Sequence, residues 1–263
     1  MKESREKFSI LIPVHNEGKR IKRNLEEVKR TLDNLGCNYE IIAIDDGSSD
    51  DTGKILQELK IGIPHLIINS NQKNFGKGRA LKKAFKYASG DLIVWLDADL
   101  DLHPFQIKAL YDIMVLDDAD IVIGSKMHPN SKVAYPLNRR IISLGYYYFI
   151  RLLFNLPCHD TQTGLKLFKR GVLEAVFPRI LVKKFAFDLE VLVNSYKLGF
   201  KLVEAPIVLE SQRPFGRIGI NSIFTTLWDT LAIWYRMYIL KYYDRIDYHR
   251  RKGLLREFKR VRQ

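Results

Sequence analysis

The chain has little cysteine and few histidines, and their placement already excludes several kinds of protein. Its 263 residues contain two cysteines, Cys37 and Cys158, and six histidines. Two distant cysteines without a CxxC spacing disfavour both a disulfide framework and a zinc site. The histidines are scattered, which indicates structural roles. The sequence also has no internal repeat and no low-complexity segment, so we expect one large domain with at most one appendage.

Long hydrophobic runs are also missing. The run from Phe8 to Val14 follows a charged start, but it has only seven residues and contains Pro13, which indicates a strand rather than a secretory leader. The longer apolar segment 220–243 is interrupted by Asp229 and Arg236, which argues against a membrane-spanning helix. We therefore expect a protein without a spanning helix, peripheral on the cytoplasmic side of the cell membrane, or of the endoplasmic reticulum in a eukaryote.

Positive charge is plentiful but unevenly distributed. The formal net charge is +13, and residues 236–263 hold ten Lys or Arg against three Asp or Glu. Such a basic tail suits an anionic membrane surface or another polyanion, and it does not suit a protein that binds nucleic acid over its whole body. The Trp and Tyr residues beside it fit a helix lying in the membrane interface, and a helix packed on the protein's own sheet is the alternative.

Apolar strand-like runs alternate with amphipathic helical patterns, which predicts an α/β fold with a doubly wound, mostly parallel sheet. The predicted strands are 8–14, 40–44, 65–69, 92–96 and 119–124, and helices are predicted between them. Beyond Gly124 the pattern is less regular, with helices over 137–155 and 187–198 and strands over 165–168 and 201–209. In such sheets ligands bind beyond the carboxyl ends of the strands.

Three carboxylates, Asp97, Asp99 and Asp101, follow the buried run 92–96. Carboxylates this close repel one another unless a cation lies among them, and hard oxygen ligands favour Mg²⁺ or Mn²⁺. An isolated motif of this kind can equally be a solvated turn that caps the next helix. Because polar residues also follow the strands at 13–17 and 45–47, we favour one crevice that holds a metal ion and a nucleotide.

Taken together, the motifs resemble those of the GT-A glycosyltransferases of family 2. The stretches ILIPVHNEGKRI, AIDDGSSDDT, NFGKGRALKKAF and WLDADLDLHP occur in that family's order. DTQTGLKLFKR and FAFDLEVL are similar to the branch that glycosylates polyprenyl phosphates, the dolichyl-phosphate glucose and mannose synthases. The resemblance covers roughly 8–211. It implies a GT-A catalytic domain over 1–210, amphipathic, basic, membrane-associating helices over 211–263, and a place in protein glycosylation.

Carried over position by position, the resemblance implies where the nucleotide sugar binds. Pro13, His15 and Glu17 would contact the nucleoside, and Ile44 and Asp46 would surround the base. Cations are needed beside the donor diphosphate, and three are available for it: Lys73, Lys77 and Arg217.

The resemblance also implies a cation site and an acceptor site. Asp97 and Asp99, with Ala98 between them, would hold the cation, and Asp101 stands where mannose synthases usually have Gln. Arg139 and Ser143 match the acceptor-phosphate positions of an RxxxS motif, and Lys126 stands where those enzymes often have Arg. Residues four apart share a helix face, so this pair and Arg140 can clamp a phosphate, although a solvated basic helix end is the alternative.

The acceptor decides whether a catalytic base is needed. A lipid phosphate is already anionic near neutral pH, because its second pKa is about 6. A sugar hydroxyl would instead require a carboxylate base, for which Asp160, Asp188 and Glu190 are candidates that can equally pair with basic residues. The QxxRW motif of processive family 2 synthases is missing, so polymer synthesis is not expected.

We therefore expect an inverting, metal-dependent transferase that moves one hexose from a nucleotide sugar, preferably UDP-glucose, to dolichyl or polyprenyl phosphate. Four alternatives stay open: a GDP-mannose-dependent synthase, a family 2 transferase acting on a sugar hydroxyl, a sugar-nucleotide pyrophosphorylase, and a basic membrane adaptor without catalysis. Under the adaptor hypothesis, replacing Asp97 or Asp99 leaves binding intact.

Overall fold

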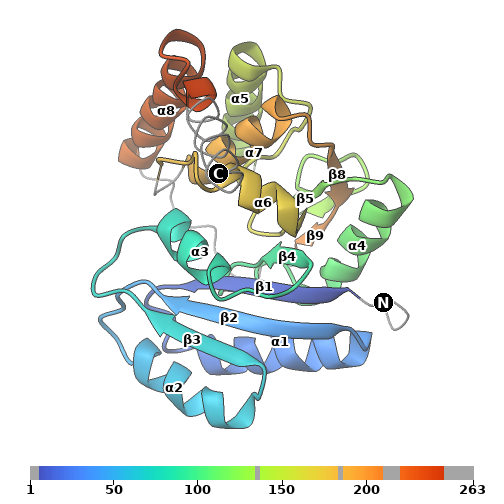
Figure 1. Cartoon of the computed structure of the whole chain (residues 1–263), viewed down its shortest axis with the longest axis vertical. Coiled ribbons are helices and arrows are strands. Elements are labelled where there is room, and N and C mark those ends of the chain that lie inside the picture. Colours follow the sequence, from blue (N-terminus) through green and yellow to red (C-terminus); the bar gives the residue numbers. More distant parts are fainter. Residues whose placement is uncertain (1–5, 134–136, 183–185, 210–219, 246–263) are drawn as a thin grey trace, which may run out of the picture.

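The computed structural model describes residues 6–133, 137–182, 186–209 and 220–245, with no side-chain description for 137–139 and 220–223 (Figure 1). A seven-stranded sheet has the order β3-β2-β1-β4-β7-β5-β8, and β7 alone runs antiparallel to its neighbours. The predicted doubly wound, mostly parallel α/β fold is therefore confirmed. The strands of the sheet are β1 (Lys7–Val14), β2 (Asn38–Asp45), β3 (Leu66–Ser70), β4 (Leu92–Trp95), β5 (Ile121–Ser125), β7 (Lys166–Lys169) and β8 (Leu202–Pro206).

Helices cover both faces of this sheet (Figure 1). They are α1 (Ile21–Leu35), α2 (Thr52–Gly62), α3 (Lys77–Phe85), η1 (Pro104–Gln106), α4 (Ile107–Leu116), α5 (Leu137–Phe154), α6 (Arg170–Val176), α7 (Phe187–Lys197), α8 (Ile220–Trp234) and the π-helical η2 (Tyr235–Ile239).

The predictions missed two elements and merged two others. Helix α6 escaped notice because its seven residues give fewer than two helical turns of periodicity. The predicted strand 201–209 is split at Ile207 into β8 and β9 (Val208–Leu209), and β9 pairs with the unpredicted β6 (Lys132–Val133). The split arises because Ser131 Oγ accepts a hydrogen bond from the Ile207 amide at 2.9 Å.

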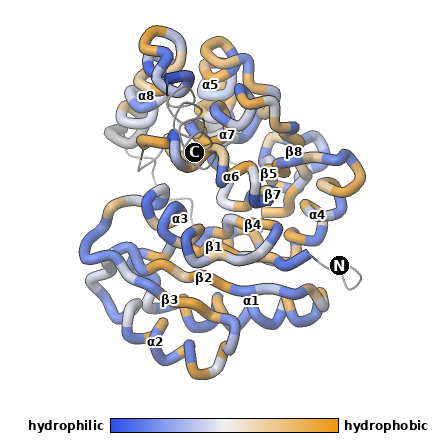
Figure 2. Tube along the Cα trace, in the orientation of Figure 1, coloured by the Kyte–Doolittle hydropathy of each residue, from blue (hydrophilic) through white to orange (hydrophobic). Residues whose placement is uncertain are grey.

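Alternate residues along the strands enter two separate cores. On β1, Ile10 and Ile12 join the core under α1, α2 and α4, while Leu11 joins the core under α3, α5, α6, α7 and α8. Side chains of successive strand residues point to opposite faces, so strands covered on both sides read as continuous apolar runs. Figure 2 shows these strands as hydrophobic segments inside the molecule.

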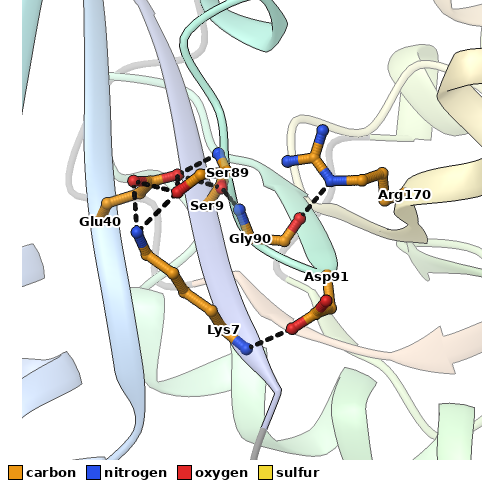
Figure 3. Close-up of polar contacts among 7 residues, drawn as sticks. All are labelled: Lys7, Ser9, Glu40, Ser89, Gly90, Asp91 and Arg170. Carbon is orange, nitrogen blue, oxygen red and sulfur yellow. Dashed lines mark hydrogen bonds and ion pairs between the residues drawn. The ribbon is translucent and has the colours of Figure 1, made fainter.

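A polar cluster fixes the amino-terminal edge of the sheet, opposite the edge where ligands are expected (Figure 3). Glu40 of β2 accepts hydrogen bonds from Lys7 Nζ at 2.7 Å, Ser9 Oγ at 2.6 Å and the Ser89 amide at 2.5 Å. Ser9 Oγ in turn accepts from the Gly90 amide at 2.8 Å. Burial alone would raise the pKa of Glu40, but these donors outweigh it and lower the pKa to about 2. The cluster ties β1 to β2 and to the turn before β4.

The C-terminal helices pack on the same side of the sheet as α5 and α7 (Figure 1). The Tyr146 hydroxyl of α5 lies 3.0 Å from the Thr230 hydroxyl of α8. Farther along, Glu190 of α7 accepts a hydrogen bond from the Tyr243 hydroxyl and lies 3.3 Å from the Arg236 guanidinium. Within the described ranges, none of the helices combines the length and hydrophobicity needed to cross a membrane.

Candidate active site

A cavity of about 220 Å³ opens where β1, β2 and β4 end. Eight residues predicted from the sequence line it: Pro13, His15, Glu17, Asp46, Lys77, Asp97, Ala98 and Asp99. Parallel strands bring their carboxyl ends to one edge, which is why loops far apart in sequence meet here. The walls also include Asn74 and Gly76. The predicted site did not contain these two residues, although the stretch NFGKG is typical of a tight loop before a helix.

Asp46 shapes the cavity by holding the loop that precedes α3. One of its carboxylate oxygens accepts from Asn71 Nδ2 at 2.7 Å, and the other accepts from the Gly76 amide at 2.7 Å. Gly47 beside it has a φ of 68°, and a Cβ there would lie 2.3 Å from the Lys73 carbonyl carbon. Only glycine fits this approach, because both the backbone angle and the space exclude a side chain.

An ion pair occupies the centre of the site. Lys77 Nζ, at the start of α3, lies 2.7 Å from Asp97 Oδ1 at the end of β4. Burial would lower the pKa of Lys77, but the charges of Asp97 and Asp188 outweigh it and hold that pKa above its ordinary value. Burial would likewise raise the pKa of Asp97, and Lys77 reverses this effect, so Asp97 is ionised. The site thus presents a carboxylate and an ammonium side by side.

A second ion pair lies beneath the first, completely inside the protein. Lys166 Nζ of β7 lies 2.5 Å from Asp188 Oδ1 of α7 and donates to the Thr163 carbonyl at 2.5 Å. Burial lowers the pKa of Lys166, and Asp188 offsets part of that effect. In the same loop, a Cβ on Gly164 would lie 2.0 Å from Asp97 Oδ2, so this glycine packs directly against the Asp97 carboxylate. The DTQTGLK motif therefore contacts Asp97 through Gly164, and its Lys166 forms the buried ion pair with Asp188 of the FDLE motif.

The three carboxylates considered as bases are all engaged within the protein. Asp188 is 4% exposed and bound to Lys166, and Glu190 is fully buried. Glu190 accepts from the Val182 amide at 2.7 Å and the Leu181 amide at 3.0 Å, besides its contacts with η2 and Tyr243. Asp160 accepts from the Lys126 amide at 3.1 Å and from the Gln162 amide at 3.1 Å. Each carboxylate has internal partners that explain its position.

Other predicted donor residues lie outside the cavity walls. Ile44 is completely buried in the core two residues before Asp46. Lys73 is exposed, with its Nζ 5.5 Å from the centre of the Phe75 ring. Asp101 is exposed and lines a separate groove of about 1310 Å³ beside α1, together with Arg20, while Asp99 borders both spaces.

The predicted acceptor residues come from two elements. Lys126 follows β5 and is near enough to Asp97 for its charge to help lower the pKa of that carboxyl. Ser143 is half-buried on α5, Arg140 is exposed on the same helix, and Arg139 belongs to its first turn. Arg217, predicted for the donor phosphate, lies outside the described residues.

The donor set of the cavity fits Mg²⁺ or Mn²⁺. Asp97 and Asp99 supply hard carboxylate oxygens at the same wall, which these ions prefer. In the part of the chain that the structure describes, no group of three or more His, Cys, Asp or Glu side chains is arranged for a metal ion. One or two carboxylates completed by substrate phosphates and water is the usual magnesium site in nucleotide enzymes, so the residues present suffice.

Comparisons with known proteins agree with this geometry. The family model described as glycosyl transferase family 2 matches residues 9–177. A dolichyl-phosphate beta-glucosyltransferase of Trichomonas vaginalis (ALG5C) is 30% identical over 210 residues, covering 76% of this chain and 62% of that protein. A dolichyl-phosphate beta-glucosyltransferase of Dictyostelium discoideum is 31% identical over 213 residues, covering 76% of this chain and 65% of that protein. The chain thus spans less than two thirds of the length of these relatives.

A solved structure extends the likeness in fold. Glucosyl-3-phosphoglycerate synthase from Mycobacterium tuberculosis, in complex with Mn²⁺, uridine diphosphate and phosphoglyceric acid, superposes with a TM-score of 0.67. The match covers 89% of this chain and 79% of that one at 17% identity, which supports a shared GT-A fold and nothing finer.

Proposed function

Since this chain belongs to glycosyl transferase family 2, we propose that it transfers one hexose from a nucleotide sugar to a polyprenyl (dolichyl) phosphate, with inversion at the anomeric carbon. UDP-glucose is the donor we favour, because the relatives at about 30% identity are named dolichyl-phosphate beta-glucosyltransferases. The observation that carries the proposal is the cavity that joins the nucleoside-side residues Pro13 and Asp46 to Asp97, Asp99 and Lys77.

In this proposal the nucleotide enters at the ends of β1 and β2 and directs its diphosphate toward Asp97 and Asp99. Asp97 and Asp99 would hold Mg²⁺ or Mn²⁺, and such an ion would supply positive charge to offset the negative charge that grows on the leaving group. The Lys77 ammonium lies 2.7 Å from Asp97, and in this proposal it exchanges that carboxylate for a diphosphate oxygen when the donor binds. Lys77 thereby stabilises the departing nucleotide.

The acceptor phosphate would be bound by cations rather than activated by a base. Lys126, Arg139 and Ser143 are the residues we assign to this phosphate, with Arg140 beside them. Its oxygen is already anionic and attacks the anomeric carbon in line with the departing diphosphate. The internal partners of Asp188 and Glu190 support this choice, since a hydroxyl acceptor needs a carboxylate free to take its proton.

The test is transfer of radiolabelled hexose into organic-extractable polyprenyl phosphate, with UDP-glucose and GDP-mannose compared in the presence of Mn²⁺. We expect label from UDP-glucose, lost with EDTA. Asp99→Asn should reduce turnover by at least about a hundredfold with an unchanged melting temperature. Asp101→Asn is the matched control, because Asp101 lines the other groove, and should keep most of the activity.

The outcomes separate the alternatives. Label from GDP-mannose alone would show that the protein is a mannosyltransferase, and it would overturn the choice of UDP-glucose as donor. No label from either donor, in a protein that still binds UDP with Mn²⁺, would mean that the enzyme uses another sugar or a different acceptor, and Asp160, Asp188 and Glu190 would then be tested as bases for a sugar hydroxyl. The adaptor hypothesis would be favoured if the wild-type protein transferred no hexose and bound no nucleotide, but bound membranes as well as its Asp99→Asn variant does.

We also propose that the reaction takes place at the cytoplasmic face of a membrane. Residues 1–210 would form the catalytic domain, and residues 211–263 would contribute membrane-associating helices. The ten Lys or Arg against three Asp or Glu in residues 236–263 support this attachment, because basic segments are attracted to anionic lipids.

A further inference from the structure

Helix α1 carries a buried amide among the side chains that it turns toward the core. The buried residues of the helix are Ile21, Asn24, Leu25, Val28, Thr31 and Leu32. Asparagine is a poor helix former, and a buried amide costs free energy unless it is hydrogen-bonded. Asn24 is 4% exposed, and its Nδ2 donates to the Ala98 carbonyl oxygen at 2.8 Å, across 74 positions of sequence. This bond to a distant turn explains why an amide stands in the stripe.

Ala98 belongs to the turn that carries the two carboxylates assigned to the cation, and we call residues 97–100 the DAD turn. The Leu100 amide donates to the Asp97 carbonyl at 3.2 Å, which closes the turn, and Leu100 has a φ of 54°. The left-handed region is unfavourable for a leucine because its Cβ crowds the backbone. Such a conformation persists only where surrounding contacts hold it. The DAD turn therefore needs an anchor.

Helix α1 supplies that anchor after the sheet has ended. The Leu96 amide still donates to a β1 carbonyl at 3.1 Å, and among the described residues it is the last of this segment to bond to the sheet backbone. Asn24 then binds Ala98. One helical turn farther along α1, Glu27 Oε1 lies 3.1 Å from His103 Nε2. Residues three apart lie on the same face of a helix. The segment between β4 and η1 is thus attached to α1 at both of its ends.

The Asn24 bond reaches the DAD turn from the side opposite the candidate active site. Asn24 lines the groove of about 1310 Å³ beside α1, whereas Ala98 lines the cavity of about 220 Å³. Asp99 borders both spaces. Asn24 therefore acts on the cavity through the backbone of the turn, without lining the cavity itself.

We infer that Asn24 is a positioning residue for the cation site, because it fixes the peptide that links Ala98 to Asp99 and so the direction of the Asp99 carboxylate. Without its donor, the buried Ala98 carbonyl turns toward another partner, since buried carbonyls are nearly always hydrogen-bonded. Asp97 is held independently by Lys77 at 2.7 Å, so the displacement falls on Asp99. The inference rests on the proposed function, under which Asp97 and Asp99 hold the ion.

Binding of Mn²⁺ to the full chain in the presence of UDP, followed by the electron paramagnetic resonance signal of the free ion, tests this role without hexose transfer. Asn24→Leu keeps the branched shape of the side chain and removes the donor. It should weaken Mn²⁺ binding by about ten- to hundredfold, the range found when groups that orient metal ligands are removed. Binding of UDP without metal, measured by calorimetry, should stay unchanged, and excess Mn²⁺ should restore hexose transfer.

Thr31→Val is the matched control, and it should bind Mn²⁺ as the wild type does. Thr31 is another buried polar residue of α1, 6% exposed, and its hydroxyl donates to Glu27 at 3.2 Å rather than to the DAD turn. Circular dichroism should show both variants folded. If Asn24→Leu is not folded, Asn24→Ser repeats the test, because its shorter side chain does not reach Ala98.

A folded Asn24 variant that binds Mn²⁺ as tightly as the wild type would overturn the inference, even if its melting temperature fell, because a merely structural role lowers stability alone. An equal loss of Mn²⁺ binding in Thr31→Val would overturn it as well. A wild-type protein that binds neither UDP nor Mn²⁺ would refute the donor site of the proposed function and this inference with it. If the wild type binds both, Asn24→Leu weakens Mn²⁺ binding and no hexose is transferred, only the proposed acceptor is refuted.

Discussion

Replacing Glu40 by Gln tests how the amino-terminal edge of the sheet is held. The Glu40 side chain is 8% exposed and has Lys7, Ser9 and Ser89 as hydrogen-bond donors. A Gln amide keeps the shape but removes the negative charge, and it turns an NH₂ group toward one or more of these donors. The strands at this edge are β1, β2 and β4, whose opposite ends carry the cavity.

The magnitude follows from the pKa of Glu40. Its pKa falls from 4.5 to about 2 on folding, and about 1.4 kcal/mol per pKa unit makes the ionised carboxylate worth roughly 3 kcal/mol of folding free energy. Because the folded state has the lower pKa, this stabilisation is complete above the ordinary value of 4.5. It is lost progressively as the pH falls toward the folded value. We therefore expect Glu40→Gln to destabilise the protein by about 2–3 kcal/mol near neutral pH.

Urea unfolding followed by tryptophan fluorescence at about pH 6.5 and about pH 3 measures this effect. The difference in unfolding free energy between wild type and Glu40→Gln should be largest at the higher pH and shrink by more than half at the lower one. Glu26→Gln, on the exposed side of α1, is the control for loss of a carboxylate. A difference that stays constant between the two pH values would refute the assignment of the stabilisation to the ionised Glu40.

The remaining predictions concern the layer beneath Asp97. Gly164→Ala should sharply reduce hexose transfer, because its Cβ would lie 2.0 Å from Asp97 Oδ2 and must displace that carboxylate, whereas Gly171→Ala, which meets nothing within 4 Å, should leave activity unchanged. Lys166→Met should destabilise the fold by about 3–5 kcal/mol in urea unfolding, because it leaves Asp188 buried without its cation. Adding Asp188→Asn should restore part of that loss, and no recovery would show that the two charges act independently.

Much of the candidate site could be predicted because its residues follow strands directly. Asp46 and Asp97 each stand just after a buried apolar run, and parallel strands bring such positions to one edge. Sequence position says less about where a side chain points. Ile44 lies in the core because β2 is covered on both faces up to its end, and Asp101 lines a different groove because the turn after β4 has no strand periodicity to fix where its side chains point.

The amino-acid sequence by itself determined the alternation of strands and helices, the carboxylates after β4, the basic C-terminal region and the family, because these depend on local periodicity, spacing and composition. Only the tertiary structure decided that β7 runs antiparallel between β4 and β5 and carries Lys166 toward Asp188. It also decided that Lys77 pairs with Asp97, and that α8 exposes one apolar face while packing with the other. Strand order and charge pairing arise from contacts between residues far apart in the chain. These contacts form only when all the strands and helices pack together, so local patterns in the sequence do not predict them.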